Sequence, residues 1–151
     1  MFALDIVNFT QQKVSLKLLT DVATYTASRL KLSGELSLVL AGDKRLHTLN
    51  KEFRSYNKTT DVLTFPAPKE IRNALGEIFI NLNDCRRSRK YLVVFQKKKS
   101  FTYILVFLLI HGLLHLAGDN DETEKERLQM VAKGEKIMQE LFKNDIIKEN
   151  L

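Results

Sequence analysis

The sequence predicts an α+β fold, a mixed sheet of about four strands with helices packed on it. Three observations favour this class. Stretches with strand and helix periodicity alternate as far as Arg54, two short β-rich runs flank a pair of prolines, and the last third of the chain has helical patterns. We expect one domain over residues 1–151, because this length is typical of a single hydrophobic core.

The N-terminal part begins with a strand–helix–strand unit. Residues 2–8 read as a strand, and residues 36–40 alternate as a strand with one more apolar side. Ser33–Gly34 breaks the helix between them, and Asp43 is expected to cap a further helix that runs to Arg54. The first helix shows its apolar face at three- and four-residue spacing, through Leu18, Leu19, Val22, Tyr25 and Leu30.

Two more strands and two more helices complete the expected fold. Residues 62–65 and 75–82 are apolar, β-rich runs, and the connection between them contains two prolines. Residues 99–117 are strongly apolar, and residues 121–144 carry apolar side chains at helical spacing. The C-terminal third is therefore predicted to be two helices.

The chain is basic, with 24 Lys and Arg against 18 Asp and Glu, a net charge of +6 and a pI near 9.4. This balance favours an anionic partner such as nucleic acid or membrane headgroups. Seven basic residues are concentrated in one short stretch, and a solvated helix end and loop explains them as well as a phosphate-binding surface does. They are Arg86, Arg87, Arg89, Lys90, Lys97, Lys98 and Lys99.

We expect no membrane segment and a cytoplasmic location. Residues 101–118 are the only candidate for a membrane span, but they contain His111 and His115. A central helix covered on all sides explains the same composition. The single cysteine, Cys85, cannot form an internal disulfide, and the N-terminus does not resemble a secretory signal.

The segment HGLLHLAGDND, residues 111–121, carries the candidate chemistry. Two histidines four residues apart project from one face of a helix, so His111 and His115 can bind one ion. Gly118 can take a positive φ and turn the chain, which lets Asp121 supply a third ligand. Two imidazole nitrogens and one carboxylate oxygen leave a fourth tetrahedral position for water, as in catalytic zinc sites.

Two alternatives stay open for this segment. Asp121 also fits as the N-cap of the last helix, with Glu124 at the N3 position, and Asp119 is a second candidate ligand. The spacing is zincin-like, close to that of the zinc proteases. Gly112 stands where those enzymes have a general-base glutamate, which counts against peptide hydrolysis and is compatible with phosphodiester cleavage.

The same segment resembles the H-G-x-x-H-L-x-G-Y-D-H signature of the bacterial YbeY endoribonucleases. A second signature, L-N-x-x-[FY]-R followed by T-D-V-L-[ST]-F-P, is similar to residues 49–54 and 60–66, and residues 75–80 resemble a third segment. The resemblance spans most of residues 1–145. Asp121 aligns with the third metal-ligating histidine of the family, which changes the charge of the site by one unit. The first signature is matched at His111, Gly112, His115, Leu116 and Gly118.

The resemblance implies a metal-dependent endoribonuclease that prefers single-stranded RNA. The implied role is maturation of the 3′ end of small-subunit (16S) rRNA and ribosome quality control. One zinc ion per chain, or another divalent metal, would be held by His111, His115 and Asp121. Arg54 corresponds to an invariant arginine and would hold a phosphate, so Arg54 and His115 are the expected catalytic residues.

Four further basic side chains are expected to contact the RNA, namely Arg86, Arg87, Lys97 and Lys98. The alternative is a non-catalytic protein that binds RNA or the ribosome and has a structural or weakened metal site. A metallopeptidase is the third interpretation.

Overall fold

The computed structural model describes residues 1–148, which contain a four-stranded sheet in the order β1-β2-β4-β3. Strands β1 (Phe2–Asn8), β2 (Gly34–Ala41) and β4 (Ala74–Asn81) pair in parallel. Strand β3 (Val62–Pro66) pairs antiparallel with β4 and forms one edge of the sheet. The predicted mixed sheet of four strands is confirmed.

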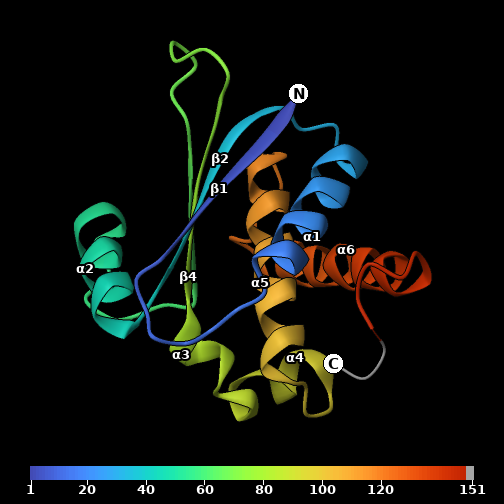
Figure 1. Cartoon of the computed structure of the whole chain (residues 1–151). Coiled ribbons are helices and arrows are strands. Elements are labelled where there is room, and N and C mark those ends of the chain that lie inside the picture. The colour runs from blue at the N-terminus through green and yellow to red at the C-terminus, as the bar shows by residue number, and fades with distance from the viewer. Residues whose placement is uncertain (149–151) are drawn as a thin grey trace.

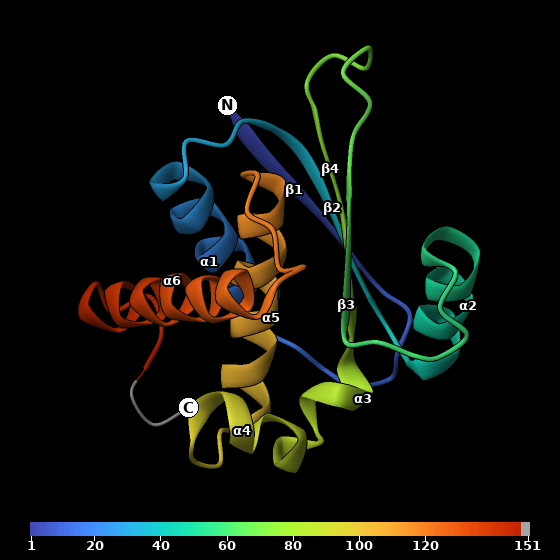
Figure 2. The same cartoon turned by 180° about the vertical axis from the view of Figure 1, so that it is seen from behind.

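Helices cover the two faces of the sheet unequally. Figures 1 and 2 show α1 (Leu16–Arg29), α5 (Phe101–Leu116) and α6 (Glu124–Lys143) on one face, whereas α2 (Asp43–Arg54) lies on the other. The predicted α+β class is confirmed. Three short helical segments connect β4 to α5: α3 (Leu82–Cys85), the 3-10 helix η1 (Ser88–Tyr91) and α4 (Leu92–Phe95).

Helix α5 is the central helix of the fold, as its composition predicts. It contacts β3 and β4 on one side and α1 and α6 on the others. Its side chains from Tyr103 to Ile110 are all buried, and Ile104, Leu109 and Leu113 are completely buried. Within residues 1–148, no helix combines the length and the apolar character that crossing a bilayer requires.

Glycines bring α5 close to both of its neighbours. A Cβ atom at Gly112 would lie 2.8 Å from Cδ1 and 2.9 Å from Cγ2 of Ile78 on β4. A Cβ atom at Gly134 of α6 would lie 2.9 Å from the ring of Phe107 on α5. Separations this short between carbon atoms are repulsive, so both close approaches depend on glycine. These contacts fix the depth at which α5 sits between the sheet and α6.

The ends of three helices differ from the sequence prediction. Helix α1 ends at Arg29, before the expected break at Ser33–Gly34, because Lys31 already takes a positive φ of 59°. Asp43 is not the cap of α2: Gly42 is the N-cap, and Asp43 is the first helical residue. The carboxylate of Asp43 is thereby available for partners outside the helix.

Helix α6 also starts later than predicted. Its N-cap is Thr123, whose hydroxyl accepts from the backbone N–H of Glu126, while the Glu126 carboxylate accepts from the backbone N–H of Thr123. The interpretation of Asp121 as the cap, with Glu124 at N3, is therefore wrong. Asp121 lies outside the helix, in the turn that follows α5.

Candidate active site

Three potential ligand atoms meet at the C-terminal end of α5. Nε2 of His111 and Nε2 of His115 lie 3.1 Å apart, and Oδ2 of Asp121 lies 3.4 Å from the first and 3.2 Å from the second. Ligand atoms held at about 2.0 to 2.1 Å from one tetrahedral ion lie about 3.3 Å from one another. The donor set therefore fits one divalent ion of zinc's size with a coordination position left open.

Each histidine has a feature that suits it to bind such an ion. Nδ1 of His115 donates to the main-chain carbonyl of Asp119 at 3.0 Å, which leaves its Nε2 as the acceptor. Burial lowers the pKa of the His111 imidazole, the neighbouring His115 lowers it further, and Asp121 acts in the opposite direction. Neutral imidazole is the form that binds metals.

The turn after α5 brings Asp121 back to the two histidines. Gly118 has a φ of 105°, as the sequence predicts, and nothing lies within 4 Å of where its Cβ would be. Only the backbone conformation therefore requires a glycine at this position. Arg127 of α6 donates to the main-chain carbonyls of Asp121 and Glu122, at 3.3 and 3.0 Å, and holds the turn against α6.

The carboxylate of Asp119, the second candidate ligand, points to another partner. Nζ of Lys133 lies 3.1 Å from each of its two oxygens. Since the carbonyl of Asp119 accepts the hydrogen bond from His115, Lys133 supports that imidazole through one intervening residue. Lys133 is not predicted from the sequence, because a contact between residues so far apart on two elements leaves no local pattern.

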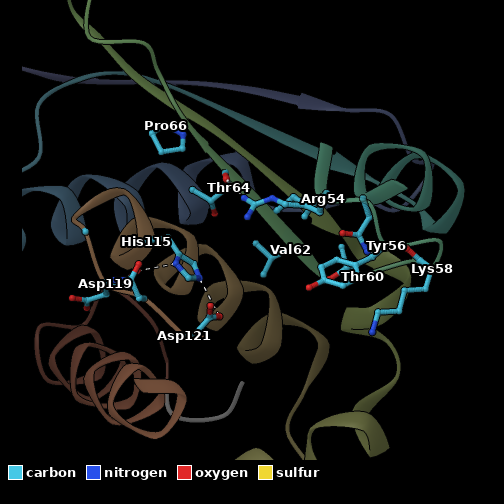
Figure 3. A pocket seen from close by; sticks show the side chains of 14 residues that line it. Arg54, Tyr56, Lys58, Thr60, Val62, Thr64, Pro66, His115, Asp119 and Asp121 are labelled. Atoms are coloured by element: carbon cyan, nitrogen blue, oxygen red, sulfur yellow. Dashed lines mark hydrogen bonds and ion pairs between the residues drawn. The ribbon is translucent and has the colours of Figure 1, made fainter. Parts of the chain in front are cut away.

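Two of these three residues, His115 and Asp121, line a cleft with a volume of about 550 Å³. Figure 3 shows His115 and Asp121 toward one end of this cleft, with Tyr56 and Lys58 at the other and Arg54 between them. Helix α5 and the turn after it line the first end, while α2, the loop that follows it and β3 line the rest. The lining residues are Asn50, Arg54, Tyr56, Lys58, Thr60, Val62, Leu63, Thr64, Pro66, His115, Gly118, Asp119, Asn120 and Asp121.

Arg54 presents its guanidinium to the cleft from the C-terminal end of α2. One Nη donates to the main-chain carbonyl of Thr64 at 2.8 Å, and Cζ lies 5.5 Å from the ring of Phe65. Both partners belong to β3, so the edge strand holds the guanidinium in place. No carboxylate within residues 1–148 forms an ion pair with Arg54, which leaves most of its N–H donors for a ligand.

The four other basic residues expected to contact substrate do not line this cleft. Arg87 binds Asp43 at 2.6 Å and the buried Asp84 at 2.7 Å, and Arg86 donates to the side chain of Asn83. The hydrogen bond from Arg87 holds the pKa of Asp43 well below its usual range. The other two of these four residues, Lys97 and Lys98, lie in the exposed loop before α5.

Comparison with known proteins agrees with this geometry. The model of the family described as Endoribonuclease YbeY matches residues 4–142. The chain belongs to the YbeY endoribonuclease family. Among its relatives, a protein of Shouchella clausii named Endoribonuclease YbeY is 32% identical over 139 residues, covering 82% of this chain and 84% of the relative. A protein of Bartonella quintana with the same name is 37% identical over 114 residues, covering 74% and 70%.

A solved structure shares the fold of this chain. The solution structure of a Thermotoga maritima protein superposes with a TM-score of 0.60 at 25% identity, covering 95% of this chain and 91% of that one. The cluster that could hold a metal lies inside the matched region, and its third member is Asp121. A carboxylate in place of the third histidine of the YbeY signature thus still reaches the two imidazoles.

Proposed function

We propose that this chain is a single-domain, metal-dependent endoribonuclease that cleaves single-stranded RNA. Membership of the YbeY family supports the reaction class. The observation that carries the proposal is the triangle of His111, His115 and Asp121, of which His115 and Asp121 line the same cleft as Arg54. The finer proposals follow from the family: maturation of the 3′ end of 16S rRNA, a part in ribosome quality control, and a cytoplasmic location.

We propose zinc as the ion, one per chain, because two neutral imidazoles and one carboxylate with an open position suit it best. When bound, the ion supplies Lewis acidity that activates water for attack on a phosphodiester. His111, His115 and Asp121 provide its ligands, and the hydrogen bond from His115 to the carbonyl of Asp119 fixes the ligating nitrogen.

Arg54 has the second role in this proposal. Its guanidinium binds two non-bridging oxygens of the phosphate and offsets the charge that develops there in the transition state. The hydrogen bond to the Thr64 carbonyl orients it before RNA arrives, so little side-chain freedom is lost on binding. Lys97 and Lys98 remain candidates for contacts with RNA that extends beyond the cleft, as do Arg86 and Arg87.

The test is metal content and RNA cleavage measured on the same samples. Untagged wild type, His115→Ala, Asp121→Ala and the control Glu122→Ala are analysed by plasma mass spectrometry and incubated with single-stranded RNA. We expect near-stoichiometric zinc and cleavage in wild type and in Glu122→Ala, and a loss of both in the two other variants. A chelator should abolish cleavage, and added zinc should restore it.

Three results would contradict the proposal in different ways. A wild type that contains no metal and takes up no added zinc means that Asp121 does not complete a metal site. RNA that is bound equally with and without chelator and is never cleaved favours the non-catalytic RNA-binding protein. Casein turnover by the zinc-loaded chain would instead favour a metallopeptidase. Gly112 argues against that function, because it stands where the zinc proteases have a general-base glutamate.

A further inference from the structure

The cleft has an aromatic end that the phosphodiester chemistry does not use. Tyr56 lines the cleft in the loop after α2, and 60% of its surface is exposed. Nζ of Lys58, which also lines the cleft, lies 5.6 Å from the centre of the Tyr56 ring. An exposed aromatic ring beside a cation within a cleft is the arrangement with which proteins bind unpaired bases and the phosphates between them.

This aromatic end is held rigidly although it lies in a loop. Ser55 ends α2 with a φ of 63°, and the backbone N–H of Tyr56 then donates to the carbonyl of Asn50 at 3.2 Å. The side-chain amide of Asn50, which is only 4% exposed, donates to the carbonyl of Lys58 at 2.9 Å. One buried residue, Asn50, therefore fixes the backbone on both sides of residue 57, through its main-chain carbonyl on one side and its side-chain amide on the other.

The charges along the cleft favour the phosphates of an anionic chain at one of its two ends. Asp121 lies toward one end with His115, Lys58 lies at the other, and Arg54 lies between them (Figure 3), while the charge of Asp119 is offset by Lys133. A polyanion is attracted to the basic end and repelled by the acidic end unless a cation is bound there. The ring of Tyr56 is therefore placed beside the part of the cleft where phosphates are most stable.

We propose that an unpaired RNA base stacks on the ring of Tyr56 and that Lys58 binds the adjoining phosphate, so that this pair selects single-stranded over double-stranded RNA. The inference rests on the proposed endoribonuclease function and adds a base-binding site to it. A base paired in a duplex keeps its faces stacked on its neighbours and cannot lie flat on a side chain. Stacking does not read base edges, so the site tolerates any sequence.

Binding of fluorescent RNA tests this proposal on the metal-loaded protein, at a temperature where cleavage is slow. For Tyr56→Ala we expect the Kd for a single-stranded oligonucleotide to rise by about 5- to 100-fold, and the Kd for a duplex of the same sequence to stay unchanged. Tyr56→Phe keeps a stacking ring and should bind within about twofold of wild type. The tyrosine is exposed, so neither change removes a core contact.

Phe9→Ala is a matched control. Phe9 is also exposed and also has a cation over its ring, with Cζ of Arg45 at 4.1 Å, but it lines a different hollow. We expect this variant to bind single-stranded RNA as wild type does. An RNA with an abasic residue at the stacked position should weaken binding to wild type and leave binding to Tyr56→Ala unchanged, since the two changes remove the same contact.

The outcomes separate this inference from the proposed function. Wild type that cleaves RNA while Tyr56→Ala binds the single strand as tightly as wild type overturns the stacking site alone. Equal loss of single-stranded and duplex binding in Tyr56→Ala also overturns it, because the ring then does not recognise unpaired bases. Wild type that neither binds nor cleaves RNA overturns the proposed function itself.

Discussion

Gly112 of α5 lies against Ile78 of β4 so closely that a Cβ atom at residue 112 would come within 2.8 Å of Cδ1 of the isoleucine. Residue 112 directly follows His111, the first candidate ligand, so the depth of this contact also sets where the imidazole points. In the zinc proteases the same position carries a glutamate that acts as general base. In this fold it faces the completely buried Ile78 and has no room for a side chain.

Gly112→Ala should therefore destabilise the protein, although alanine is the better helix former. Overpacking a core costs about 1–3 kcal/mol, and the gain in helix propensity offsets about 1 kcal/mol of it, so we expect a net loss of up to about 2 kcal/mol in urea unfolding. The double variant with Ile78→Ala should lose less than the sum of the two single variants, because the new methyl group occupies the space that the isoleucine leaves. Additive losses would contradict the steric explanation.

The course of the chain follows largely from local patterns, whereas the sheet order does not. The buried position of α5 is expected from an apolar run that is too long and too continuous for a surface helix. The insertion of β4 between β2 and β3 depends on contacts between distant segments, which no periodicity records. The short helices between residues 82 and 95 escape prediction because each is about one turn long.

The candidate site, too, has features that local sequence patterns predict and features that only the fold shows. His111, His115, the turn at Gly118 and the return of Asp121 follow from spacing and from the conformational freedom of glycine. The basic stretch has no period that distinguishes Arg87, which binds two carboxylates, from residues exposed in a loop. The support from Lys133 and the aromatic end of the cleft became visible only with the fold.

Lys133 should affect metal affinity without touching the metal. Its Nζ holds both carboxylate oxygens of Asp119, whose carbonyl orients His115. For Lys133→Ala we expect zinc to bind up to about tenfold more weakly, as for other residues that orient a metal ligand. Competition with a fluorescent zinc chelator measures the dissociation constant. Lys136→Ala, an exposed lysine on the same helix, is the control, and an equal effect of both variants would indicate a general loss of charge instead.

The pairing of Asp43 with Arg87 should make stability depend on pH in a known direction. The hydrogen bond from Arg87 lowers the pKa of Asp43 from its ordinary value of 3.8, so the folded state binds this proton less readily than the unfolded state does. The carboxylate therefore stabilises the fold above about pH 4, and this contribution is lost progressively as the pH falls below that value.

Comparing wild type with Asp43→Asn by urea unfolding at pH 7, 5 and 3 measures this contribution. Because the side chain of Asp43 is 39% exposed, we expect a difference of only about 1 kcal/mol or less at pH 7, shrinking toward pH 3. Asp5→Asn is the control, since Asp5 is exposed and has no ion pair among the described residues. A difference for Asp43→Asn that grows as the pH falls would contradict the assigned pairing.

Arg54→Glu should abolish RNA cleavage without loss of metal. The guanidinium lines the cleft and binds no carboxylate of residues 1–148, so charge reversal replaces phosphate attraction with repulsion, and we expect kcat/KM to fall by about a hundredfold or more. Arg54→Lys keeps the charge but loses the planar two-donor geometry, and should retain an intermediate rate. Arg45→Glu makes the same charge change on the same helix at a residue outside the cleft, and should have a much smaller effect. Zinc content and thermal unfolding of all three variants should match wild type, because neither arginine is a ligand or part of the core. Cleavage by Arg54→Glu at the wild-type rate would show that another group binds the phosphate.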